Sequence, residues 1–355
     1  MSNYWAEWLR IYDTDHFTLS RKQGWDRFVN SAPREEFATL SRTQMGRLSK
    51  DERRDYNEAR MVWNANLPTV RTSQLAHANS IIDMVLASAR RDGDKLRGSV
   101  VIDAEPGLGK TTIATRYGRA FHRDQHRRYG TETPEGHQFL PVAFIPIAAQ
   151  TTLKGLNQRL LNFYGHPAAK TATKDRLAVH LVDVVGSCQT RLIIIDDIHF
   201  VDFRNRNGTE MSNHLKWLAN ELPVTFVFAG VDLEQKRFFD EGLTGEEAVL
   251  AQTARRATRV QVAPFSIASD AGMTAWIAIL RAFGTHLKLA DGDGEMLVPL
   301  AHEIHRRTQG RVASLTNMLD RASYLAIRSG TERITDDVLA KVRVDNAGEN
   351  GARRL

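Results

Sequence analysis

The chain has 355 residues, of which 42% are hydrophobic and 25% charged, with a formal net charge of +6 and one cysteine. This composition allows a sizeable core and more than one domain, and no apolar run is long enough to span a bilayer. The lone Cys188 excludes an internal disulfide, and the amphipathic start MSNYWAEWLRIYD lacks a secretion signal. We therefore expect a cytoplasmic protein whose positive charge favours polyanionic partners.

The first part of the chain, residues 1–72, predicts an N-terminal helical extension. The stretch REEFATLSRTQMGRLSKDERRDYNEARMVW has helical character, with Ser49 as a plausible cap and Pro68 ending the last helix. From residue 73 a further helix leads to Gly98. Because this helix leads directly into the first predicted strand, we place the start of a new domain at residue 73.

Short apolar runs then alternate with helical patterns. Five such runs, each close to a turn signal, predict strands over 100–104, 141–147, 192–196, 224–229 and 258–262. Continuous apolar strands separated by helices indicate a parallel sheet covered by helices on both faces, which is an α/β fold. We assign this core to residues 73–265.

After Pro264 the pattern becomes entirely helical. Helices are predicted over 270–283, 295–308, 311–328 and 335–344, with DGDGE and RSGTERIT as turns. We interpret residues 266–343 as a helical lid on the core. Residues 344–355, which include AGENGARRL, are expected to be disordered.

A phosphate-binding motif lies directly after the first predicted strand. AEPGLGKT, residues 104–111, fits the pattern G-x-x-x-x-G-K-[ST] with Ala104 in place of the first glycine. Its glycines let backbone N–H groups face phosphate oxygens, Lys110 reaches the β- and γ-phosphates, and the Thr111 hydroxyl binds Mg²⁺. The alternative is a plain glycine-rich turn, which the flanking strand and helix disfavour. The expected nucleotide-binding residues are Glu105, Pro106, Gly107, Leu108, Gly109, Lys110, Thr111 and Thr112.

A second motif, LIIIDDIHF, contains the third predicted strand and places two acidic residues at its end, beside that loop. Asp196 is expected to bind Mg²⁺ through water, and Asp197 to polarise the attacking water. The alternative role for Asp197 is a helix-capping acid. Aspartate is shorter than the usual glutamate by one methylene, about 1.5 Å, so we expect slow hydrolysis and a long-lived nucleotide-bound state.

Three further segments could complete a nucleotide site. VTFVFAGVD places Val231 and then Asp232 at a strand end where a γ-phosphate sensor would lie, although a plain core strand is equally compatible. Arg256, or else Arg255, could act as an arginine finger on a neighbouring subunit, or belong to a solvated or DNA-facing charge run. Arg311 could fold back as a second sensor, or be a surface residue after Gly310.

The helix after the phosphate loop carries arginines at helical spacing. Arg116, Arg119, Arg123 and Arg127 lie three or four residues apart, which places them on one helix face. We expect this face and TTLKG, residues 151–155, to lie on one edge of the sheet and to follow a phosphate backbone together. A solvated charged face is the ordinary alternative for such a run.

Taken together, the motifs resemble those of AAA+ ATPases over residues 75–343. Within that class the chain resembles the transposition regulators TniB and TnsC, relatives of MuB and IstB. The resemblance is carried by LIIIDDIHF, HLKWLANELPVTFVFAGVD, AVLAQTARRATRVQV and TQGRVASLTNMLDRASYLAIRSGTERIT. The chain departs from the family at Ala104, at Asp197, where Glu is usual, and at Val231, where Thr is usual.

The resemblance implies an ATP- and Mg²⁺-dependent homo-oligomer, a ring or a helical filament around double-stranded DNA. Such proteins hand the DNA to a DDE-type transposase, in some systems with a target-selection protein, and hydrolysis disassembles them. Carried over by segment, the sequence-independent DNA contacts fall on Arg123, Arg127, Arg128, Thr151 and Lys154.

Two other functions remain open from sequence alone. One is a signalling or defence ATPase that acts through protein partners without DNA. The other is a helicase loader or origin-binding protein, which would usually carry a winged-helix domain after the lid. Only about a dozen residues follow the predicted lid, so the transposition regulator is the preferred interpretation.

Overall fold

The computed structural model describes residues 3–12, 16–89, 97–201, 203, 206–233 and 257–343. The chain divides into two compact units. One comprises Phe17–Ser31 and Ser73–Val262, and the other Met1–His16, Ala32–Thr72 and Ala263–Leu355. This division differs from the linear one predicted, because residues 17–31 group with the sheet and the rest of the N-terminal extension groups with the C-terminal helices.

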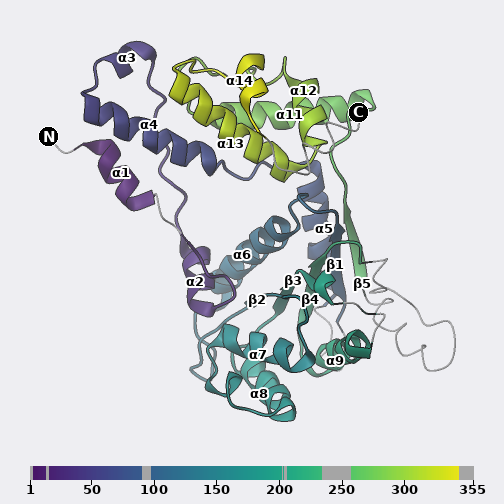
Figure 1. Cartoon of the computed structure of the whole chain (residues 1–355). Helices are drawn as coiled ribbons and strands as arrows, with labels where there is room; N and C mark the ends of the chain where they lie inside the picture. The colour runs from purple at the N-terminus through teal and green to yellow at the C-terminus, as the bar shows by residue number, and fades with distance from the viewer. Residues whose placement is uncertain are drawn as a thin grey trace. The chain divides into compact units, whose positions relative to one another are not determined.

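The first unit is built on a five-stranded parallel sheet (Figure 1). Its strands are β1 (Ser99–Ala104), β2 (Val142–Pro146), β3 (Leu192–Asp196), β4 (Thr225–Gly230) and β5 (Ala257–Val262). They lie in the order β2-β3-β4-β1-β5. All five predicted strands are confirmed to within one residue at each end, and the α/β fold is confirmed with them.

Helices cover both faces of this sheet, and as a result every residue of β3 and β4 is buried. The helices of the unit are α2 (Lys22–Asn30), α5 (Ser73–Ser88), α6 (Lys110–Tyr129), α7 (Leu153–Tyr164), α8 (Lys174–Ser187) and α9 (Arg206–Glu221). Two short 3-10 helices, η1 (Pro167–Ala169) and η2 (Ile198–Phe200), complete it. Helix α6 contacts four of the five strands and therefore links the phosphate loop to the core.

Helix α2 packs against α6, although residues 31–109 separate the two helices in the sequence (Figure 1). The Trp25 ring is fully buried, stacks on Phe144 at 6.0 Å, and donates its indole N–H to His122 Nδ1 at 3.0 Å. Gly118 makes room for it, since a Cβ there would lie 2.7 Å from Ile194 and 3.1 Å from the Trp25 ring. Burial lowers the pKa of His122 to about 3, so this imidazole stays neutral and accepts the bond.

The second unit is entirely helical in its described part. It contains α1 (Tyr4–Tyr12), α3 (Arg42–Gly46), α4 (Lys50–Ala65), α11 (Asp270–His286), α12 (Ala301–Thr308), α13 (Val312–Ser329) and α14 (Asp336–Lys341). Helix α4 packs on both α1 and α13, so the N-terminal helices and the C-terminal helices share one body. The predicted cap is confirmed, because the Ser49 hydroxyl accepts from Glu52 N in a capping box.

A buried ion pair joins the two ends of the chain within this unit. The Arg60 guanidinium donates to both carboxylate oxygens of Glu332, at 2.5 and 2.8 Å, and both side chains are at most 5% exposed. The Trp63 indole also donates to His286 O at 2.8 Å. These contacts explain why residues 32–72 belong with the C-terminal helices and do not form a separate extension.

One predicted helix begins later than expected. The pattern predicted a helix over 295–308, whereas α12 begins at Ala301. Pro299 would lie inside the longer helix, where it lacks the N–H for an intrahelical bond. The predicted tail at 344–355 lies outside the described residues.

Candidate nucleotide-binding site

The loop between β1 and α6 has the backbone that phosphate binding requires. Gly107 and Gly109 have φ values of +79° and +87°, which side-chain-bearing residues rarely adopt. Helix α6 begins at Lys110, so its unpaired N–H groups face the loop. Ala104 ends β1 and is not among the positive-φ residues, so the departure from glycine there costs the loop nothing.

Lys110 is folded back onto this loop. Its ammonium donates to Ala104 O and Glu105 O, both at 2.9 Å, and the residue is only 8% exposed. Burial lowers the Lys110 pKa, while four surrounding carboxylates oppose that shift: Asp196, Asp197, Asp103 and Asp232. A cation held in such surroundings is placed to meet an incoming polyphosphate.

The predicted metal ligands come together at the end of β3. The Thr111 hydroxyl donates to Asp196 Oδ2 at 2.6 Å, and the Asp197 N–H donates to Asp196 Oδ1 at 2.9 Å. Burial raises the Asp196 pKa, and the bond from Thr111 partly offsets this. A hydroxyl and a carboxylate are the hard oxygen donors that Mg²⁺ binds beside phosphate and water. Among the described residues, no group of three or more His, Cys, Asp or Glu side chains is arranged to hold a metal ion by itself.

Asp197 follows β3 in a left-handed conformation, with φ of +57°. Aspartate tolerates this conformation better than most side chains because its short carboxylate can bond locally. Its side chain is 42% exposed, and its Oδ1 lies 3.9 Å from His199 Nδ1. The carboxylate is therefore open to solvent beside the buried Asp196, and its role in polarising water stays a prediction.

Asp103 is a site residue that the motifs did not reveal. Its Oδ1 accepts from Leu233 N at 3.2 Å, and its Oδ2 accepts from Arg259 Nη2 at 2.8 Å. One carboxylate on β1 thus holds β5 and the turn after β4, which carries Val231 and Asp232. The signal available in the sequence was an acid, Asp103, interrupting an otherwise apolar strand.

The described structure does not test the two remaining nucleotide candidates. Arg256, like Arg255, lies outside the described residues. Arg311 precedes α13 in the other unit, where Gly310 closely approaches Phe265 and accepts its N–H at 3.0 Å. The finger and second-sensor roles therefore stay predictions.

The arginines of α6 do not form one free basic face. Arg119 and Arg123 donate to the carbonyls of Val29 and Ser31, which end α2. Arg127 and Arg128 pair with Asp124, at 2.6 and 3.1 Å.

The two segments expected on one edge of the sheet lie at its opposite ends. Helix α6 runs back from the carboxyl ends of the strands, so its last turns lie near Arg191, just before β3, and Arg128 and Arg191 line one cavity. Thr151 and Lys154 follow the carboxyl end of β2. Thr151 is buried and donates to Ala148 O at 2.6 Å, whereas Lys154 is exposed. Their separation follows from the length of α6, because a 20-residue helix spans about 30 Å, and a joint contact of the two segments with a phosphate backbone stays a prediction.

The chain is similar to a known protein family and to several solved structures. Residues 92–238 match the family model described as AAA domain. No match to the sequence was found among curated proteins. Among solved structures, the Aeropyrum pernix ORC2 protein is similar at 15% identity and a TM-score of 0.58, covering 79% of this chain and 70% of its own.

Two further archaeal structures have the same fold. The Aeropyrum pernix ORC1 protein, solved in complex with DNA, is 17% identical with a TM-score of 0.56, covering 82% of this chain and 69% of its own. Cdc6p of Pyrobaculum aerophilum is 14% identical with a TM-score of 0.53, covering 76% and 66%. The fold is therefore that of AAA+ P-loop ATPases. No helix in the described ranges combines the length and hydropathy needed to cross a membrane.

Proposed function

We propose that the chain is an ATP-dependent, DNA-binding AAA+ regulator of transposition. It assembles as a ring or filament on duplex DNA and presents that DNA to a DDE-type transposase, with or without a target-selection protein. The observation that carries the nucleotide part is the contact of Thr111 with Asp196 beside Lys110. The sequence resemblance to TniB and TnsC supports the transposition part, and a similar fold has been solved with DNA.

Each residue of the site has a role in this proposal. When bound, MgATP supplies the γ-phosphoryl group and the metal that neutralises its charge. The loop 105–109 and the start of α6 hold the phosphates, with Thr112 next to Thr111. Thr111 and Asp196 hold the metal, Lys110 turns from the loop carbonyls to the phosphates, and Asp197 orients a water. Arg256 of one subunit reaches the nucleotide of the next, and Arg311 senses it.

We expect Asp197→Glu to change turnover and leave ATP binding within about twofold. The longer side chain reaches about 1.5 Å further toward the attacking water, so the single-turnover hydrolysis rate should rise. Asp197→Asn is the matched control, because it keeps the size and the tolerance of a positive φ but loses the charge, and it should hydrolyse more slowly. Equal rates for all three proteins would show that Asp197 does not position the water.

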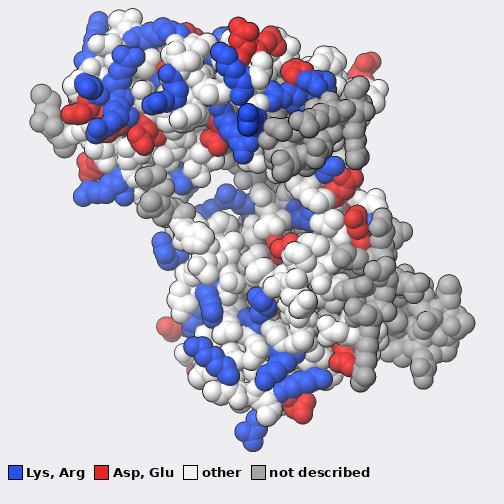
Figure 2. Space-filling view, in the orientation of Figure 1, with Lys and Arg blue, Asp and Glu red and all other residues white. Residues whose placement is uncertain are grey.

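Lys154 is the first choice for a DNA contact. It lies at the start of α7, it is exposed, and no hydrogen bond or ion pair of its side chain occurs in the described part of the chain. Other cations follow on α7, the next turn and α8, and Figure 2 shows basic side chains over this region. They are Arg159, Lys170, Lys174 and Arg176. Arg127, Arg128, Arg123 and Thr151 are secondary candidates, since the structure gives each of them a protein partner.

The test is electron microscopy of the chain with duplex DNA, with ATP, with a slowly hydrolysed analogue, and without nucleotide. We expect rings or filaments on DNA only with nucleotide. Particles that assemble with nucleotide but never engage DNA would favour a signalling or defence ATPase. Monomers under every condition would exclude the proposal.

Lys154→Gln should weaken binding to duplex DNA by the same factor for every DNA sequence. Loss of one phosphate contact reduces the slope of log affinity against log salt by about 0.9. Fluorescence anisotropy with labelled duplex between low and high salt measures that slope. Lys50→Gln removes the same charge from an exposed position at the start of α4 and should leave the slope unchanged. Identical slopes for the two variants would remove Lys154 from the DNA path.

A further inference from the structure

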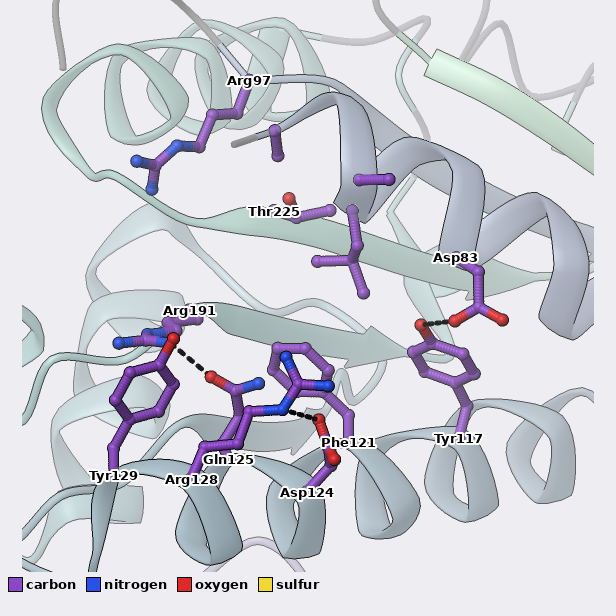
Figure 3. Close-up of a pocket in the computed structure, with 13 residues that line it drawn as sticks. Asp83, Arg97, Tyr117, Phe121, Asp124, Gln125, Arg128, Tyr129, Arg191 and Thr225 are labelled. Carbon is purple, nitrogen blue, oxygen red and sulfur yellow. Dashed lines mark hydrogen bonds and ion pairs between the residues drawn. The ribbon is translucent and has the colours of Figure 1, made fainter. Parts of the chain in front are cut away.

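A cavity of about 570 Å³ lies at the end of the sheet opposite the phosphate loop. Its walls are α5, α6 and the residues that begin β3 and β4, all within the sheet-containing unit. Figure 3 shows Arg97 entering from one side and the α6 side chains from the other, with Thr225 on the strand between them. The volume is within the range of small-molecule sites, about 300–1,000 Å³.

Two guanidinium groups, those of Arg97 and Arg191, face this cavity. Arg191 stacks on Tyr129 at 4.3 Å and on Phe139 at 5.3 Å, and it donates to Gln125. Arg97 is half-buried, and in the described ranges it makes no hydrogen bond or ion pair. Burial and the nearby charge of Arg191 lower the Arg97 pKa. Two partly buried cations facing one space are more stable with an anion present.

A buried hydroxyl adds a third donor. Thr225 is 1% exposed and lines the cavity, and its Oγ1 has no hydrogen-bond partner among the residues that the structure describes. A buried hydroxyl without a partner is destabilising, and such groups are usually satisfied by water or a ligand. The acids on the wall are already engaged, since Asp83 accepts from Tyr117 at 2.6 Å and Asp124 pairs with Arg128 at 3.1 Å.

We propose that this cavity binds a small organic anion. Its phosphate or carboxylate group lies between Arg97 and Arg191 and accepts from Thr225, and its apolar or planar body packs against Phe121 and Tyr129. Arg191 is pre-oriented by its two aromatic rings and Gln125, which lowers the entropy cost of binding. The site is separate from the phosphate loop, because β1 alone spans about 20 Å between them.

The test uses calorimetric titration of the full chain carrying Lys110→Ala, so that the phosphate loop does not take the probes. The probes are adenosine 5′-monophosphate, citrate and inorganic phosphate, which separate an organic phosphate, a carboxylate and a bare ion. We expect one of the two organic probes to bind at a single site more tightly than inorganic phosphate. Adding Arg97→Gln should weaken it about tenfold or more.

Two further variants separate ligand binding from folding. Thr225→Val keeps the shape of the side chain and removes only the hydroxyl, so it should weaken the probe and leave the melting temperature unchanged or higher. Arg328→Gln removes an equal charge from an exposed position near the end of α13 and should change nothing. The proposal is overturned if no organic probe binds, or if Arg97→Gln and Arg328→Gln bind alike.

Discussion

Lys110→Ala should abolish ATP binding and nucleotide-dependent DNA assembly together. The Lys110 ammonium is the only cation that the described structure places within the phosphate loop, and it is 8% exposed among four carboxylates. Without it, those acids would repel the phosphates. Charge-assisted bonds to a phosphate contribute about 1.5–3 kcal/mol each, so ATP affinity should fall by about 100-fold or more. Fluorescence titration with a labelled ATP analogue measures the affinity, and electron microscopy on duplex DNA measures assembly.

The same variant should fold normally. Its two hydrogen bonds go to loop carbonyls that water can reach once the side chain is removed, and Glu105 is exposed. Thermal melting should therefore shift by only a few degrees, and Lys50→Ala, an exposed lysine on α4, serves as the control for general loss of charge. Filaments that still form with nucleotide in Lys110→Ala would show that the phosphate loop is wrongly assigned.

The strands and the phosphate loop were predictable because their signals are local. A buried parallel strand needs a continuous apolar run, and β3 is such a run ending in two acids. The loop needs glycines where φ is positive, and Gly107 and Gly109 supply them. Both signals lie within a few consecutive residues, so the sequence pattern alone locates the strands and the phosphate loop.

The packing of the N-terminal segment was not predictable, because its contacts are remote in sequence. Trp25 lies in the polar helix KQGWDRFVN, and its partner His122 is 97 residues away. Arg60 pairs with Glu332 across 272 residues. Neither hydrophobic periodicity nor a short motif indicates such contacts, and the burial of a charged residue such as Arg60 follows only from the fold.

The prediction of a free basic face on α6 was wrong for a related reason. Helical spacing correctly placed Arg119 and Arg123 on one side of the helix. It did not show that α2 ends there and that its last carbonyls need donors. Terminal carbonyls of a helix lack intrahelical partners and attract cations. The arginines do lie on one helix face, but Arg119 and Arg123 bind the end of α2 and so stabilise the fold.

Trp25→Ala should destabilise the sheet-containing unit by about 3–5 kcal/mol. The indole is fully buried between Phe28, Phe144 and Gly118, and it fills the space that a glycine leaves on α6. Its loss also leaves His122 Nδ1 without the donor it accepts from, inside the core. We expect a lower urea midpoint for the transition that reports on this unit, and faster proteolysis in residues 17–31 as α2 detaches.

Trp217→Ala provides the matched control, because that ring is 37% exposed on α9 and its removal should cost less than about 1 kcal/mol. Trp25→Phe should lie between the two, since it keeps an aromatic ring against Phe144 but cannot donate to His122. If α2 only covers the surface of α6, Trp25→Ala and Trp217→Ala will have the same urea midpoint. A graded series of Ala, Phe and wild type at position 25 would instead show that α2 is part of the ATPase core. The helix that begins at the phosphate loop would then depend on residues 17–31 for its stability.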